Sequence, residues 1–309
     1  MIAVTVSLPL LGAWLRGPSL TPLFSWPPPV MPANYPRFSW LAAALAVAPI
    51  AGLMASWASA WKGPTAGSER RRIPRAMPAW GWMAIGWTLA WWLLAWTRFR
   101  WFSPLQLYTF FPLWLGFVVG ANALTWRRAG TCLMLRDSKA WLRLFIASAA
   151  FWWVFEWLNR FGRNWRYLNA EAFGPLGYAV HATLCFSTVL PAVTAVRELL
   201  GTYLSLQVNF AQGPRWHWLT SRRTGWWLIA GGLAGLVLIG SWPQEFYPAI
   251  WIGPLAAAWG MGILSNRPSV TGEIATGDWR RAASWMLAAT ICGIFWEMWN
   301  FHSVAKWVY

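Results

Sequence analysis

Eight apolar runs, each close to the length of a membrane-crossing helix, dominate the sequence. A helix needs about 20 apolar residues to cross the hydrocarbon core of a bilayer. Only 11% of the residues are charged, against about 25% in soluble domains. The runs cover residues 38–61, 80–97, 105–126, 141–159, 177–200, 224–241, 246–265 and 281–300. The sequence therefore predicts an all-α, polytopic integral membrane protein with about eight transmembrane helices, surrounded by the lipid bilayer.

Basic residues lie in short clusters between these runs, and alternate clusters are larger. The formal net charge is +16, and most of the basic residues follow the first, third, fifth and seventh runs. Cytoplasmic loops of membrane proteins carry such an excess of Lys and Arg. We therefore expect a multi-pass protein of a bacterial inner membrane, with Glu156 and Glu297 near the outer, periplasmic face. Because no domain gathers the basic residues, we expect no nucleic-acid partner.

Two segments of the chain, about 140 residues apart, end in the same way. In each, a Glu and an Asn close an apolar run and a Trp-x-Tyr sequence follows. The matching residues are Glu156, Asn159, Trp165 and Tyr167 in the first segment, and Glu297, Asn300, Trp307 and Tyr309 in the second. Upstream, Gly86-Trp87 matches Gly225-Trp226. The pattern predicts two internal repeats plus one leading helix. An even number of crossings per unit makes the repeats parallel, about an axis along the membrane normal.

The expected organisation has five parts. They are an N-terminal interfacial and Pro-rich segment (1–37), a leading helix with a basic inner loop (38–79), repeat A with four helices (80–200), an inner basic linker (201–223) and repeat B with three helices (224–309). Residues 1–16 are expected to be a retained segment, with a signal peptide as the alternative, because no basic start precedes the apolar residues. Repeat B ends at Tyr309, where a further helix would begin, so we expect the natural chain to continue.

The repeated Glu-x-x-Asn motif supplies the candidate polar site. Its spacing puts both side chains on one helix face, and polar groups in a membrane are costly unless they are paired or used. The candidate residues are Glu156, Asn159, Glu297 and Asn300, which together would bind a cation, a proton or a polar headgroup. The alternative is structural, with Glu156 paired to Arg160 or Arg163, or with Glu and Asn holding the Trp-x-Tyr turn through loop N–H groups. We favour the structural role.

Aromatic and histidine side chains fall at the same predicted depth as the two Glu residues. Many of the 31 Trp residues sit at the ends of apolar runs, which predicts a membrane-interface belt. The candidate aromatic interface consists of Trp165, Tyr167, Trp307 and Tyr309, which would anchor the protein or stack on a sugar, quinone or pigment ring. His181 and His302 are the candidates for a metal ligand or a tetrapyrrole ligand. Their spacing matches no metal motif, so the metal and the cofactor stay unassigned.

No nucleotide-binding loop, hydrolase elbow or zinc-protease helix occurs in the sequence. We therefore expect no catalytic residues and a non-enzymatic role. The expected role is an accessory or scaffold subunit of a larger membrane complex, with other membrane subunits as partners, in a complex that carries pigment, quinone or haem. One alternative is a small-molecule or ion transporter with a site at the repeat interface. Another is a lipid- or glycan-modifying enzyme that uses the two carboxyls as acid and base.

Overall fold

The computed structural model describes residues 1–17, 19–28, 74–265 and 269–309, together with isolated residues between 39 and 58. It is mostly helical (79%), which confirms the predicted all-α class. Only isolated residues of the leading helix predicted at 38–61 are described, and most of the Pro-rich stretch before it lies outside the described residues, so neither prediction is tested.

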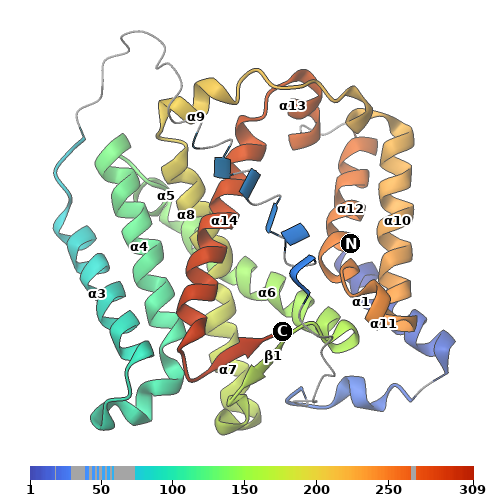
Figure 1. The fold of residues 1–309 in the computed structure, drawn as a ribbon, viewed down its shortest axis with the longest axis horizontal. Coiled ribbons are helices and arrows are strands. Elements are labelled where there is room, and N and C mark those ends of the chain that lie inside the picture. Colours follow the sequence, from blue (N-terminus) through green and yellow to red (C-terminus); the bar gives the residue numbers. More distant parts are fainter. Residues whose placement is uncertain are drawn as a thin grey trace.

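Two parts of the chain have the same order of elements. The first contains α3 (Ala79–Trp96), η2 (Arg100–Tyr108), α4 (Phe110–Ala129), α5 (Leu133–Arg136), α6 (Ser138–Gly162) and β1 (Arg166–Leu168). The second contains α10 (Arg222–Ser241), α11 (Pro243–Phe246), α12 (Ala249–Leu264), α13 (Val270–Thr276), α14 (Arg280–Phe301) and β2 (Lys306–Val308). In both, two antiparallel helices precede a longer helix that leads into a strand. Figure 1 shows that α6 and α14 reach their strands at the same, lower end of the molecule.

Other helices connect and cover these two units. They are α1 (Ile2–Arg16), η1 (Thr21–Phe24), η3 (Ala170–Phe173), α7 (Gly174–Ser187), α8 (Val189–Leu200), α9 (Leu204–Asn209) and η4 (His217–Thr220). The N-terminal segment, expected at the interface, forms α1 and packs closely against α10. A Cβ on Gly12 would collide with the Val237 carbonyl, and one on Gly240 with the Pro9 carbonyl, so this approach depends on both glycines.

The single helix predicted at 177–200 is broken between α7 and α8. Pro191 has no N–H to donate to the carbonyl one turn earlier, so the helical hydrogen bonding is interrupted there. The hydroxyl of Ser148, on α6, fills the break. It donates to the Phe186 carbonyl at 2.6 Å and accepts from the Leu190 N–H at 3.0 Å. A side chain inserted between a helical carbonyl and amide in this way is a recognised cause of a kink.

Among the described residues, two helical segments are long and apolar enough to cross a membrane, at 170–200 and Arg222–Ser241. A third appears if η2 and α4, bent by 72°, count as one span. The eight predicted crossings are therefore not all confirmed. Two reasons are visible in the sequence: α3 and α14 are rich in Trp, which contributes little to mean hydropathy, and α6 contains four charged residues.

The tryptophans do not all form an interfacial belt, because some of them are buried in the main core. Trp114 on α4 is 1% exposed and Trp299 on α14 is 2% exposed. Their rings meet edge to face, with centroids 5.0 Å apart, and Leu287 on α14 is also fully buried in this core. Aromatic pairs of this kind gain stability beyond the apolar area they bury. Part of the tryptophan content thus joins the two similar units instead of forming a surface belt.

Candidate functional site

The two Trp-x-Tyr endings meet in one antiparallel strand pair. The facing residues are Arg166 with Val308, Tyr167 with Trp307, and Leu168 with Lys306. When the endings are aligned on their Trp residues, Arg166 and Val308 are equivalent positions, and they face each other. The register is therefore what a twofold axis through this pair requires. The pairing brings the ends of α6 and α14 together, although 141 residues separate their Glu residues.

The two Asn residues hold the turns that lead into the strands. Asn159 Oδ1 accepts the backbone N–H groups of Asn164 and Trp165 at 2.7 and 3.2 Å, and its Nδ2 donates to the Trp165 carbonyl at 2.7 Å. Asn300 does the same for Trp307, with an N–H donor at 3.0 Å and a carbonyl acceptor at 2.8 Å. Both amides thus satisfy the backbone of the Trp residue that begins each ending.

Glu156 is buried near the end of α6 and binds side chains of the first ending. It is 5% exposed. Its Oε1 accepts three hydrogen bonds, from Trp152 Nε1 at 3.2 Å, Trp165 Nε1 at 3.0 Å and the Tyr167 hydroxyl at 2.5 Å. Three donors on one oxygen compensate much of the cost of burying the carboxyl group.

The local Glu–Arg pair considered from the sequence does not form. Arg160 instead donates from Nη1 to the backbone carbonyls of Leu23 and Ser25, at 2.6 and 2.8 Å. Arg163 occupies the left-handed C-cap position of α6, with φ of 48°. Ion pairs form elsewhere in the described residues, between Arg136 and Glu198, Arg280 and Asp278, and Arg281 and Glu273.

Glu297 repeats the arrangement at a more exposed position. Its Oε1 accepts the Tyr309 hydroxyl at 2.7 Å and Trp307 Nε1 at 3.4 Å. Partial burial, followed by the hydrogen bond to Glu297, raises the pKa of Tyr309 to about 12. Tyr309 therefore remains a hydroxyl donor at neutral pH.

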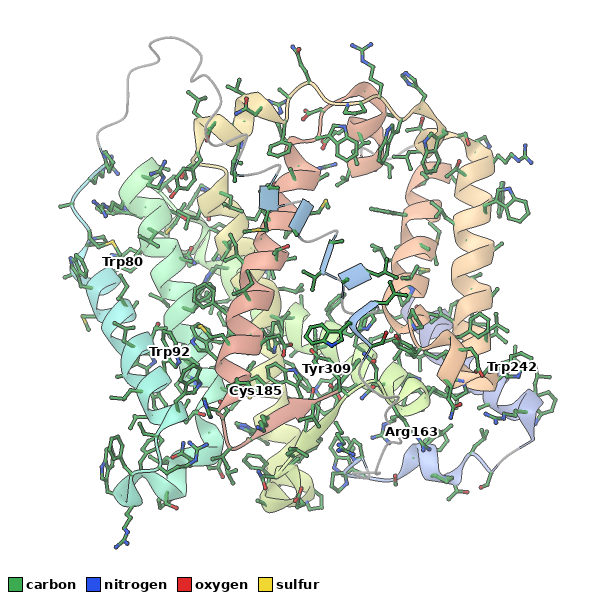
Figure 2. All side chains as sticks on the ribbon, in the orientation of Figure 1. Trp80, Trp92, Arg163, Cys185, Trp242 and Tyr309 are labelled. Atoms are coloured by element: carbon green, nitrogen blue, oxygen red, sulfur yellow. The ribbon has the colours of Figure 1, made fainter. Side chains whose placement is uncertain are left out.

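An aromatic cavity of about 270 Å³ lies between the two endings. Its lining comes from α4, α6, α7, α12, α14 and both strands, and includes Trp152, Trp165, Trp251, Trp296, Trp307 and Tyr309. Polar groups are few, with Glu297 and His181 among them, and Glu156 lies outside this lining. Tyr309 and Cys185, both labelled in Figure 2, belong to the cavity wall. The site is thus an apolar pocket with a carboxylate among its few polar groups.

The two candidate histidines are not brought together. His181 lines the cavity, with Nε2 3.5 Å from Cys185 Sγ and its ring stacked on Phe173 at 4.5 Å. His302 lies against Trp96, with ring centroids 5.3 Å apart, and is not part of the lining. Within the described ranges, no three His, Cys, Asp or Glu side chains are grouped to hold a metal ion.

Sequence reasoning missed three tryptophans of the cavity, Trp152, Trp251 and Trp296. Trp152 and Trp296 stack at 5.4 Å, and Trp251 lies 5.2 Å from Trp165. One signal was available, because Trp152 precedes Glu156 by four residues and so lies on the same helix face. The neighbours of Trp251 depend on how α12 packs against α6, which no local spacing reveals.

The arrangement suits binding of a flat apolar molecule better than two-carboxyl catalysis. Only one of the two Glu residues lines the cavity, and each is hydrogen-bonded within its own ending. Comparison of the chain with protein-family models, with curated proteins and with solved structures gives no match.

Proposed function

We propose that this chain is a multi-pass membrane protein that holds a quinone-type ring in the cavity between two repeated units, as an accessory subunit of a larger membrane complex. The observation that carries the proposal is the cavity itself, walled by stacked Trp side chains and containing few polar groups. Ligand sites are typically apolar clefts with a small number of placed polar groups. We place the cavity near the periplasmic face of a bacterial inner membrane.

Helix length supports the multi-pass part of the proposal. Helices α3, α14 and α6 contain 18, 22 and 25 residues. At the helical rise they span about 27 to 38 Å, close to the roughly 30 Å hydrocarbon thickness. Large apolar side chains also point outward from α3, where Met83 is 73% exposed and Trp82 is 62% exposed. Such surfaces are favourable in lipid and unfavourable in water.

Symmetry supports the repeat. The matching order of elements and the register centred on Arg166 and Val308 agree with two parallel copies related by a twofold axis. The equivalent strands and helix ends enclose the cavity, so each copy contributes to one shared site.

Cavity size favours a small ring system. The cavity volume of about 270 Å³ lies just below the range of typical ligand pockets, which is roughly 300–1,000 Å³. A one- or two-ring headgroup fits this space better than a tetrapyrrole macrocycle. Trp152 and Trp296 offer ring faces for stacking, while Glu297 and Tyr309 offer polar contacts.

The two alternative functions have weaker support. An acid–base enzyme needs both carboxyls on one substrate, yet Glu156 is not part of the cavity lining. A transporter site is usually near the bilayer midplane, whereas both Glu residues lie within the last two turns of their helices.

The test fills the cavity without disturbing its walls. Gly293 on α14 lines the cavity, and a Cβ there would meet no atom within 4 Å. Gly293→Phe should therefore keep the fold and weaken binding of decylubiquinone at least about tenfold, a loss of roughly 1.4 kcal/mol or more. Quenching of Trp fluorescence by the quinone measures the affinity.

Gly231→Phe is the matched control, because Gly231 is also helical and has no atom within 4 Å of a Cβ, but it lies on α10 and does not line the cavity. It should bind decylubiquinone like the unmodified protein. Equal affinity in both variants, or no saturable quenching in the unmodified protein, would contradict the proposal.

A further inference from the structure

A second cavity, of about 230 Å³, lies where η1 and the residues after it meet the end of α6. It shares no lining residue with the aromatic cavity. Its wall combines four aromatic rings, one carboxylate and one guanidinium, from Phe24, Trp26, Trp153, Trp157, Glu156 and Arg160. Two opposite charges and an aromatic wall in one small space suggest a ligand that itself carries both charges.

Ring contacts and indole N–H hydrogen bonds hold the aromatic residues of this cavity in place. Phe24 lies 5.7 Å from Trp157, and Trp26 lies 5.7 Å from Trp153, between ring centroids. The three indole N–H groups donate elsewhere, to Pro175 O, Thr183 Oγ1 and Val6 O. With their donors used, these residues can offer the cavity their ring faces, which attract cations and accept quaternary ammonium groups.

One oxygen of the Glu156 carboxylate accepts no hydrogen bond from the described residues. All three hydrogen bonds to Glu156 fall on Oε1. Its Oε2 accepts none from the described part of the chain, although Glu156 forms part of the cavity wall and is only 5% exposed. A carboxylate oxygen without a hydrogen-bond partner at the wall of a cavity favours a cation beside it.

The guanidinium also keeps free donors. Arg160 uses Nη1 for the two carbonyls that fix η1, while Nε and Nη2 donate no hydrogen bond within the described residues. The guanidinium carbon lies 5.8 Å from the Trp26 ring centre. Since Arg160 forms no ion pair with Glu156 here, both charges are open to a ligand. Arginine suits phosphate because its fork of donors matches the phosphate oxygens.

We propose that this second cavity binds a phosphocholine-type zwitterion, with the quaternary ammonium between the aromatic rings and Glu156, and the phosphate on Arg160. The same chemistry occurs in a lipid headgroup and in free phosphocholine. The position is consistent with a headgroup, because η1 lies along the lower edge of the molecule, beside the end of α6 that carries the strand (Figure 1). This site is separate from the proposed quinone cavity.

The test compares phosphocholine with 3,3-dimethylbutyl phosphate, which has the same shape but carbon in place of nitrogen. Calorimetry on the purified chain, in detergent without choline groups, measures both affinities. The unmodified protein should prefer phosphocholine about tenfold, in line with cation–π and carboxylate attraction to the ammonium. Glu156→Gln should abolish this preference, because the amide still accepts the three donors but carries no charge. Glu297→Gln, the matched change outside this cavity, should retain it.

A second variant tests the proposal even if Glu156→Gln does not fold. Arg160→Lys keeps a positive charge but loses the fork, and should weaken both phosphate probes about tenfold while leaving the preference for phosphocholine intact. Gly293→Phe should affect neither probe, which separates this site from the quinone cavity. An unchanged preference in Glu156→Gln would overturn the proposal, as would the absence of phosphocholine binding together with no selective retention of phosphatidylcholine.

Nanodiscs distinguish the two sources of the zwitterion. If the lipid headgroup is bound, native mass spectrometry should show retained phosphatidylcholine but not phosphatidylglycerol, and Glu156→Gln should lose it. If free phosphocholine alone is bound, calorimetry gives the signal and no lipid is retained. Both results support the site, whereas equal retention of both lipids together with no phosphocholine binding contradicts it.

Discussion

The two repeated endings hold the same carboxylate at different depths. Glu156 is 5% exposed and accepts three hydrogen bonds, whereas Glu297 is exposed and accepts two. The N-terminal segment accounts for the difference, because Trp157 donates to the Val6 carbonyl of α1 and Arg160 fixes η1 over the end of α6. One motif therefore serves as a buried support in the first ending and as a polar group in the wall of the aromatic cavity in the second.

Replacing the two carboxyl groups should give the largest difference in stability between the two endings. Glu156→Leu leaves two indole N–H groups and one hydroxyl without their acceptor, which should lower the free energy of unfolding by about 3–5 kcal/mol. Glu297→Leu should cost less than about 1 kcal/mol, since water can replace the lost acceptor. Thermal unfolding of the two variants in the same detergent measures the difference. Equal losses would show that burial does not distinguish the endings.

Replacing the two Asn residues should give a smaller difference in stability, because both side chains bind backbone groups. Asn159→Ala removes three hydrogen bonds and should cost about 2–3 kcal/mol, while Asn300→Ala removes two and should cost about 1–2 kcal/mol. Unfolding measurements on both variants check the order. A larger loss for Asn300→Ala would contradict the structural role assigned to Asn159.

A smaller effect should appear at high pH in the second ending. The folded pKa of Tyr309, about 12, lies above the ordinary tyrosine value of 10.0. A raised folded pKa gives stability that is present below pH 10.0 and is lost as the pH rises towards about 12, because the unfolded state ionises first. Tyr309→Phe should therefore show a flatter fall in stability across this range than the unmodified protein. Identical pH profiles would rule out the Tyr309–Glu297 contribution.

Local sequence patterns predicted much of the helical structure. The runs at 80–97, 224–241 and 281–300 end within two residues of α3, α10 and α14. The Glu-x-x-Asn spacing also identified the four side chains that organise both endings, because that spacing acts within one helix turn.

Features that depend on distant parts of the chain were not predictable. The break between α7 and α8 involves Ser148, whose hydroxyl comes from a different helix. The packing of α1 on α10 depends on Gly12 and Gly240 meeting across the fold. Burial of Trp114 was missed for a similar reason, since an indole at an interface and one in a core look alike in sequence.

The strand register has a consequence for how far the two units can diverge. In a symmetric homodimer, the residue on the twofold axis faces its own copy, so every substitution there is made twice and must tolerate itself. Joining both units in one polypeptide removes that restriction. Here Arg166 faces Val308 at the central pair, a charged residue opposite an apolar one. The position that symmetry would constrain most is therefore one at which the two halves differ in chemical character.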